Sequence, residues 1–330
     1  MKFVPYHLLD DSPNIIVDGA AGRGTVLTLS HWPKSGTPGH LKRDTSAAIV
    51  FAYLDSPSCH VQADVVSNNH FDDDGLIGIF TLVDTVTAHK YRELLLDAAS
   101  AGDFGVFKSR DAARIAFTIR AYTDSEISPL SAEIFALPYL EMAGQYYEQL
   151  LELMPSFLAN INEYEQHWKV EDKMLAASEK LIENGRITIE ERPDLDLAIV
   201  RIPSDLKAEF VHEFTQKYMA ECHPFAVNSR TSCTRLLTIR GPHVEFQYRY
   251  ETWVQLVSRR PPLRVDLKAL AEELNQSETS GGCWVFDGVE QMSPRLHLKG
   301  ADETSLAAAD IQERLERYLL IGPAIWDPFD

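Results

Sequence analysis

The sequence predicts an α/β protein with two α/β domains joined by a helical connector. Three observations support this prediction. Short apolar runs alternate with turn residues in the first third of the chain, a long helical pattern occupies the middle, and strand patterns return after it. The 330 residues also fit two domains of about 100–200 residues each. The expected boundaries are 1–128 for the N-terminal domain, 129–185 for the connector and 186–330 for the smaller C-terminal domain.

The N-terminal domain begins with apolar runs bounded by Gly, Asp and Ser, which is typical of strands or strand-helix pairs in a mainly parallel sheet. Four such runs occur, at residues 14–19, 25–30, 47–54 and 61–67. In residues 76–88 and 91–101 the apolar side chains recur at spacings of three and four. That spacing predicts two helices.

The connector contains few glycines and a long apolar series at helical spacing, which includes Tyr146, Leu150 and Phe157. Asn184-Gly185 is expected to end it. Two strands at 186–190 and 195–202 are then predicted around a Pro-Asp turn, followed by a helix over 206–222.

The rest of the C-terminal domain is expected to form a mixed sheet. Strands are predicted at 234–239, 244–250 and 253–257, and a last one after the glycine pair Gly281-Gly282. Helices are predicted at 267–274 and 305–320.

Composition excludes several classes of function. The chain has 31 Lys and Arg against 49 Asp and Glu, a formal charge of −18, which disfavours binding to long nucleic acid. The four cysteines form no CxxC pair, so neither a zinc knuckle nor a disulfide framework is indicated. No stretch reaches the ~18 apolar residues of a membrane span, and the first residues lack a signal-peptide pattern. We therefore expect a cytoplasmic protein.

The densest polar cluster is NNHFDDDG at residues 68–75, between an apolar strand run and a predicted helix. Ligands of α/β proteins usually bind at the carboxyl ends of strands. Three carboxylates and an imidazole within five residues favour a divalent cation, and this donor set suits Mn, Fe or Zn better than Ca. In an extended segment His70, Asp72 and Asp74 point the same way while Asp73 faces out.

A second interpretation of this cluster is a solvated acidic turn that caps the following helix. Gly75 and Gly78 favour the metal site, because they allow close approach to the backbone. Both interpretations stay open at this point.

Residues 70–76, HFDDDGL, resemble the HxDxDG motif of the DHH phosphoesterase superfamily, which includes RecJ-type nucleases and oligoribonucleases. The C-terminal domain adds a second similarity, to the substrate-binding domain that follows DHH domains. Its features are Ser258-x-Arg260 at a strand end, "VDL" at 265–267 and the pair Gly281-Gly282. The two patches cover less than a third of the chain.

The sequence also departs from that family. The Asp-His-His triplet is absent downstream of Asp74, and Cys283 replaces the histidine of the GGH loop. Either the N-terminal segment supplies the missing ligands, with Asp18 and His31 at strand ends, or the catalytic metal pair has been lost.

The resemblance implies a centre that holds Mn²⁺ or Mg²⁺. Its expected metal ligands, the first four of which are also the expected catalytic residues, are His70, Asp72, Asp74, Asp103, Asp18 and His31. Asp103 resembles the strand-end aspartate that completes the dimetal site. Arg259 and the backbone N–H groups of Gly281 and Gly282 are expected to bind the phosphate of the substrate. Separately from the resemblance, strand alternation places Arg249 on the polar face of a predicted strand, where it is expected to contact an anionic ligand.

Two functions follow as alternatives. The first is a metal-dependent hydrolase of phosphoesters or phosphoanhydrides that acts on a small nucleotide or phosphorylated metabolite through metal-activated water. The second is a DHH-like scaffold without catalysis that serves as a binding or regulatory protein. The expected partner is a small phosphorylated substrate, with neither long nucleic acid nor membrane, and a homodimer stays open.

Overall fold

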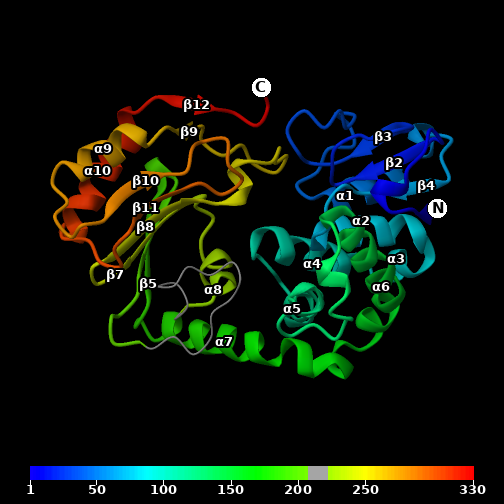
Figure 1. The fold of residues 1–330 in the computed structure, drawn as a ribbon, viewed down its shortest axis with the longest axis horizontal. Coiled ribbons are helices and arrows are strands. Elements are labelled where there is room, and N and C mark those ends of the chain that lie inside the picture. Colours follow the sequence, from blue (N-terminus) through cyan, green and yellow to red (C-terminus); the bar gives the residue numbers. More distant parts are fainter. Residues whose placement is uncertain (207–221) are drawn as a thin grey trace. The chain divides into compact units, whose positions relative to one another are not determined.

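The computed structural model describes residues 1–206 and 222–330. It divides into two compact units (Figure 1). Unit 1 comprises Met1–Asp172 together with Gln255–Arg259, and unit 2 comprises Lys173–Val254 and Arg260–Asp330. The expected connector at 129–185 is not a unit of its own. Helix α6 (Tyr139–Ala159) belongs to unit 1, and α7 (Glu165–Glu183) begins in unit 1 and continues into unit 2.

The predicted α/β class is confirmed, and unit 1 contains the parallel sheet. Its strands are β1 (Lys2–Phe3), β2 (Asn14–Val17), β3 (Thr25–Leu29) and β4 (Val65–Ser67). They pair in parallel in the order β1-β4-β2-β3. Strand β2 is entirely buried. Because the three strands β4, β2 and β3 are neighbours and parallel, their carboxyl ends meet at one edge.

Helices pack against this sheet and against one another. They are α1 (Ser46–Leu54), α2 (Asp73–Val83), α3 (Thr85–Lys90), α4 (Arg92–Phe104), α5 (Arg110–Thr123) and α6. Short 3-10 turns lie in the connections at Tyr6–Leu8, Pro57–Cys59, Ile134–Ala136 and Ile161–Tyr164. The helix predicted from residues 91–101 is confirmed as α4. The single helix predicted from 76–88 is two helices, α2 and α3, which are separated at Asp84.

The apolar run 47–54 lies entirely in helix α1, so the expectation of a strand or a strand-helix pair was wrong for this run. A short, fully apolar run has no periodicity that separates a buried strand from a buried helix. Thr45 marks the start of the helix, because its side chain accepts the N–H of Ala48 and so caps α1. The run 61–67 forms a strand only over Val65–Ser67.

Unit 2 contains a mixed sheet in the order β10-β11-β8-β7-β6-β5. Strands β6 and β7 are parallel, and the other neighbours are antiparallel. The strands are β5 (Thr188–Arg192), β6 (Leu197–Arg201), β7 (Arg235–Arg240), β8 (His243–Tyr248), β10 (Cys283–Phe286) and β11 (Arg295–Lys299). A separate pair is formed by β9 (Arg264–Val265) and β12 (Ala324–Trp326).

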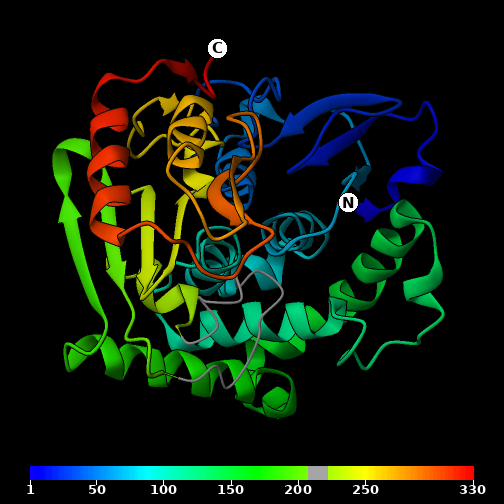
Figure 2. The ribbon, with the colours of Figure 1, turned by 60° about the vertical axis from the view of Figure 1, so that its left-hand side comes forward.

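Helices α9 (Lys268–Asn275) and α10 (Ala308–Ile321) cover one face of this sheet (Figures 1 and 2). Leu270, Leu274, Ile311 and Leu315 from these helices are buried in the core that they form with the strands. A short helix α8 (Pro224–Asn228) and the 3-10 turns Pro193–Leu195 and Tyr250–Thr252 complete the unit. The helices predicted at 267–274 and 305–320 are therefore confirmed as α9 and α10.

Two other predictions for this half of the chain had different outcomes. The helix expected over 206–222 lies almost wholly outside the described residues. The strand expected at 253–257 was wrong, because this segment is irregular and the N–H groups of Gln255 and Val257 bond to His31 and Asp44. Strands β9, β11 and β12 were not predicted.

Candidate metal centre

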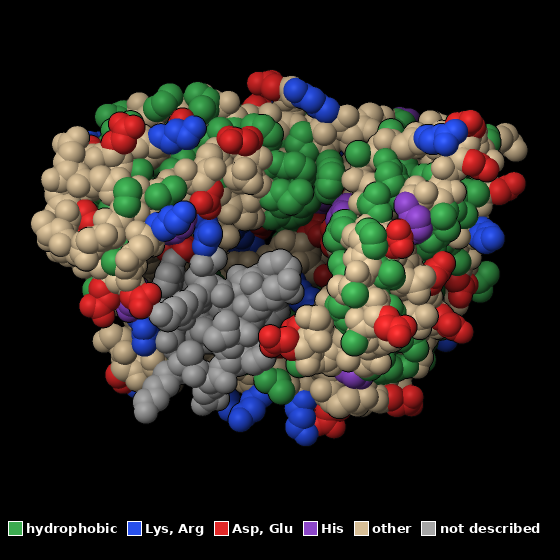
Figure 3. Space-filling view, viewed as in Figure 1, with side chains coloured by type: hydrophobic (Ala, Val, Ile, Leu, Met, Phe, Trp, Pro, Cys, Tyr) green, Lys and Arg blue, Asp and Glu red, His purple; other side chains and the backbone are tan. Residues whose placement is uncertain are grey.

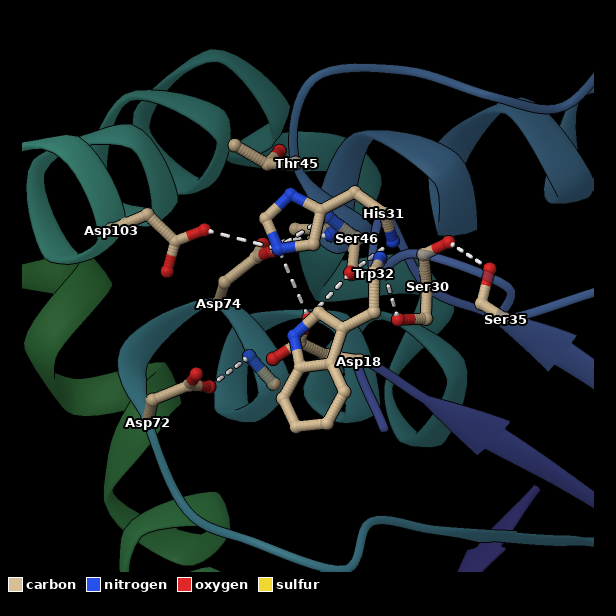
Figure 4. A network of polar contacts seen from close by, with 12 residues as sticks. Asp18, Ser30, His31, Trp32, Ser35, Thr45, Ser46, Asp72, Asp74 and Asp103 are labelled. Carbon is tan, nitrogen blue, oxygen red and sulfur yellow. Dashed lines mark hydrogen bonds and ion pairs between the residues drawn. The ribbon is translucent and has the colours of Figure 1, made fainter. Parts of the chain in front are cut away.

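Three neighbouring parallel strands carry acidic or histidine side chains at or just beyond their carboxyl ends. Asp18 follows β2, His31 follows β3, and His70 and Asp72 lie in the loop after β4. The strand order brings these three ends together although the residues are up to 54 positions apart in the chain. Asp74 of α2 and Asp103 of α4 complete the cluster, and Figure 4 shows these two residues beside Asp18, His31 and Asp72.

The imidazole of His31 is surrounded by three carboxylates. Its Nε2 lies 3.3 Å from Asp18 Oδ1, 3.6 Å from Asp103 Oδ2 and 4.0 Å from Asp74 Oδ2. Its Nδ1 lies 2.6 Å from the carbonyl oxygen of Asp44. Because a carbonyl oxygen only accepts, we assign the ring hydrogen to Nδ1. In the neutral ring Nε2 then directs a lone pair at the carboxylates, as metal ligation requires.

The second imidazole, that of His70, faces the other side of the same aspartate. Its Nε2 lies 3.3 Å from Asp18 Oδ2 and 2.9 Å from Asp72 Oδ2. The two oxygens of Asp18 thus face two different histidines. Two groups of potential ligands result, Asp18 with His31 and Asp74, and Asp18 with His70 and Asp72, and they share Asp18.

These distances fit divalent cations. Ligand atoms about 2.0–2.2 Å from one ion lie at most ~4.4 Å apart, and each histidine-carboxylate distance given above is shorter than that. The buried oxygen Asp103 Oδ2 has no hydrogen-bond partner, and Asp18 Oδ2 has only the imidazole of His70 nearby, at 3.3 Å. Buried carboxylate oxygens are normally satisfied, so these two mark a place where a cation is expected.

The backbone at Asp18 is held in an unusual conformation. Its φ is +52°, in the left-handed region that side chains other than Asn, Asp and Gly rarely adopt. The hydroxyl of Ser46 donates to Asp18 Oδ1 at 2.6 Å and accepts the N–H of His31 at 3.2 Å. Ser46 thereby holds two potential ligands in register. Local backbone strain of this kind is common at functional sites.

The DDD run does more than cap a helix. Asp72 is the N-cap of α2 and accepts the N–H of Gly75 at 2.8 Å. Asp74 accepts the N–H groups of Ser46 and Ala47 at 2.5 and 2.8 Å and so caps α1 as well. The interpretation as a solvated turn was wrong, since Asp74 is 0% exposed. Asp73, expected to face outward, is 7% exposed and was also misplaced.

Burial and crowding shift the pKa values of this cluster. Burial, followed by the charges of the neighbouring aspartates, raises the pKa of Asp18 and raises those of Asp74 and Asp103 well above the usual range. Burial also raises the pKa of Asp73 to about 7. These groups resist simultaneous ionisation unless positive charge is supplied.

In the pair His70 and Asp72, the pKa shifts favour the charged form of each side chain. Burial opposes both charges, but the charge of Asp72 and hydrogen bonds to Asp18 and Asp72 raise the pKa of His70 to about 11. The pKa of Asp72 is lowered, mainly because His70 outweighs the effect of burial. In the metal-free protein an imidazolium at His70 therefore supplies part of the missing positive charge.

Substituting Gly102 in α4 is expected to disturb the cluster. A Cβ there would lie 2.2 Å from the Cβ of Asp73, so the helix that carries Asp103 would have to move. Ala normally stabilises a helix relative to Gly by about 1 kcal/mol. Here we expect Gly102→Ala to lower the free energy of unfolding in urea by about 1–3 kcal/mol. Gly39→Ala, with nothing within 4 Å, should stay within about 0.5 kcal/mol, and equal effects would contradict this argument.

The structure places the sequence-predicted residues as follows. Asp18, His31, His70, Asp72, Asp74 and Asp103 lie together in unit 1. Asp103 belongs to the last turn of α4, so the expectation of a strand-end aspartate was wrong. Ser46 and Trp32, whose ring stacks on His70 with centroids 4.8 Å apart, were not predicted as site residues. Only the polar character of the loop before α1 pointed to Ser46.

The predicted anion ligands are divided between the units. Arg259 lies in the segment Gln255–Arg259 of unit 1. Gly281 and Gly282 lie on the turn before β10 in unit 2, where Gly281 has φ +87° and the N–H of Gly282 donates to Ser280. Arg249 is buried and binds Glu251 at 2.5 Å and the carbonyl oxygen of Thr231 at 3.1 Å. Its role is to hold the surrounding loops, so we leave it out of the candidate site.

Three further observations concern surface charge, helix character and the cysteines. On the face drawn in Figure 3, the described Lys and Arg side chains are interspersed with Asp and Glu. Among the described residues, no helix combines the length and apolar character needed to span a membrane. Cys59, Cys222, Cys233 and Cys283 are all free thiols.

Comparison with known proteins gives one result. No curated protein and no solved structure matches this chain. One family model matches residues 1–329, nearly the whole chain, and thus covers both units and every residue of the candidate metal centre. The chain therefore belongs to the family of unknown function DUF6687.

Proposed function

We propose that this protein is a hydrolase of small phosphoesters or phosphoanhydrides that depends on two divalent cations. The observation that carries the proposal is the pair of histidine-carboxylate groups that share Asp18. Asp18, with one oxygen toward each group, would help to hold both ions. Paired ions about 3.5–4 Å apart are typical of phosphatases and nucleases.

The residues that face each carboxylate oxygen of Asp18 would hold one ion. His31, Asp74 and Asp103 would bind the first, and His70 and Asp72 the second. Imidazole with carboxylates favours Mn²⁺, with Mg²⁺ as the alternative. When bound, such ions supply Lewis-acid stabilisation of phosphoryl oxygens and lower the pKa of a water ligand.

The chain's own groups would prepare this site. The carbonyl of Asp44 fixes the ring of His31, and the hydroxyl of Ser46 fixes Asp18. The raised pKa of His70 keeps its imidazole protonated in the metal-free state. His70 must lose this proton to bind a cation, so binding of a cation at His70 and Asp72 would release a proton. Arg259 would bind a non-reacting phosphoryl oxygen, since a guanidinium matches a phosphate in charge and geometry.

The resemblance of residues 70–76 to the DHH phosphoesterases supports the same chemistry. In this proposal Asp18 and His31 take the place of the absent Asp-His-His triplet. The net charge of −18 favours a small phosphorylated substrate over long nucleic acid. The free cysteines are compatible with a reducing compartment, and we propose that the protein acts in the cytoplasm.

The proposal is tested by stripping the full-length protein of metal with a chelator and titrating Mn²⁺ in a calorimeter. Hydrolysis of bis(p-nitrophenyl) phosphate, a 5′-phosphorylated dinucleotide and pyrophosphate is then measured with Mn²⁺, Mg²⁺ or chelator. We expect two Mn²⁺ per chain and activity on at least one substrate that chelator abolishes. Absence of Mn²⁺ binding would overturn the proposal, and Mn²⁺ binding without hydrolysis would favour a binding or regulatory protein.

A further inference from the structure

A short segment of the C-terminal half, Gln255–Arg259, belongs structurally to unit 1. We call it the strap. The N–H of Gln255 donates to the carbonyl of His31 at 2.8 Å, and Lys42 Nζ donates to Gln255 Oε1 at 2.5 Å. The strap is thus attached at the backbone of a candidate metal ligand.

Asp44 provides the second attachment. Its Oδ1 accepts the N–H of Val257 at 2.7 Å and the N–H of Ser258 at 2.9 Å. Val257 and Ser258 are exposed, whereas Gln255 is buried. Bonds from N–H groups to a carboxylate are charge-assisted and stronger than neutral ones.

The main chain of the same residue acts on the metal centre. The carbonyl oxygen of Asp44 accepts the Nδ1 hydrogen of His31 at 2.6 Å. Asp44 therefore contacts His31 through its backbone and the strap through its side chain. Because Ser258 directly precedes Arg259, the carboxylate also fixes where the backbone of Arg259 starts.

We propose that Asp44 is a positioning residue that holds the strap, and with it Arg259, in register with His31. The role of Arg259 in binding an anion rests on the proposed function, whereas the anchoring of the strap does not. Misplacement of a binding group by about 1 Å is enough to impair a reaction substantially. A change of the Asp44 side chain leaves its carbonyl in place, so its effect should fall on substrate binding and spare the metal.

The test compares Asp44→Ala and Asp44→Asn with the wild type in the full-length protein. Hydrogen exchange is followed in peptides that cover the strap, Mn²⁺ affinity is measured by calorimetry, and kcat and KM are measured with bis(p-nitrophenyl) phosphate. For Asp44→Ala we expect exchange at Val257 and Ser258 and the KM each to rise on the order of tenfold, since about 1.4 kcal/mol corresponds to that factor. We expect kcat and Mn²⁺ affinity to change less than about twofold.

The conservative variant and a control separate positioning from general damage. Asp44→Asn keeps an acceptor oxygen, so its exchange at the strap should be nearly as slow, and its KM nearly as low, as in the wild type. Asp55→Ala removes an exposed carboxylate of unit 1 that pairs with Arg92 at 2.7 Å, and it should leave the strap unchanged.

Two outcomes would overturn the inference. One is unchanged exchange of the strap in Asp44→Ala, and the other is a loss of Mn²⁺ affinity equal to the loss in substrate binding. If the wild type hydrolyses none of the substrates, the proposed function fails. The exchange measurement then still decides whether Asp44 anchors the strap.

Discussion

Asp18→Asn is expected to lower the stoichiometry of Mn²⁺ from two to at most one per chain and turnover by on the order of 10³-fold. The amide keeps the size of the side chain, and Asn tolerates the φ of +52° at this position. It removes the charge and replaces one ligand oxygen by an N–H donor. Because one oxygen of Asp18 faces His31 and the other faces His70, both groups of ligands are affected.

Calorimetric titration of Mn²⁺ and steady-state hydrolysis of bis(p-nitrophenyl) phosphate measure this effect. Asp11→Asn is the matched control, since its carboxylate is exposed and pairs with Arg23 at 3.0 Å. We expect that control to behave as the wild type. Two Mn²⁺ bound by Asp18→Asn with unchanged affinity would refute a role of Asp18 in holding both ions.

Asp103→Asn should stabilise the metal-free protein while it weakens the metal centre. Asp103 Oδ2 is buried without a hydrogen bond, and its carboxylate lies at the carboxyl end of α4, where the helix dipole disfavours negative charge. In chelator at pH 8 we expect the free energy of unfolding in urea to rise by about 1–3 kcal/mol. With excess Mn²⁺ the wild type should become the more stable protein, because it binds metal better.

The pH dependence gives an independent check. Burial and then the charges of Asp74 and Asp72 raise the pKa of Asp103 in the folded state above its unfolded value of 3.8. The folded state therefore holds this proton more tightly, and the contribution of Asp103 to stability falls as the pH rises above about 4. The advantage of Asp103→Asn in chelator should be small near pH 4 and grow toward pH 8.

Asp111→Asn serves as the control for this series, because its side chain is 54% exposed on the neighbouring helix. Its free energy of unfolding should stay within about 0.5 kcal/mol of the wild type. A variant Asp103→Asn that is less stable than the wild type in chelator at every pH would show that this carboxylate makes a favourable contact without metal.

Local sequence patterns predicted much of the fold and part of the candidate centre. The alternation of strand and helix patterns indicated the α/β class, and the position of NNHFDDDG between an apolar run and a helix placed His70 and Asp72 at a strand end. Where a run was uniformly apolar, as at 47–54, the pattern did not separate strand from helix. Where backbone groups bond to a distant loop, as at 253–257, an apolar run alone predicted a strand that does not form.

Several features of the centre depended on contacts between distant residues. Asp73 is buried because Gly102 of α4 lets it approach, and this relation between residues 29 positions apart leaves no local signal. Asp103 reaches His31 from the end of a helix, a geometry that depends on how α4 packs. The contact of Asp44 with the strap joins residues more than 200 positions apart.

By itself the sequence determined which segments are strands and helices in most of the chain, and that acidic and histidine side chains follow several strands. These are local properties, since side-chain spacing within a segment reports only which face of that segment is apolar. The tertiary structure decided that β4, β2 and β3 are parallel neighbours, which brings Asp18, His31 and His70 together. Strand order and helix packing arise from long-range burial of apolar surface, and no short window of sequence contains both partners of such a contact.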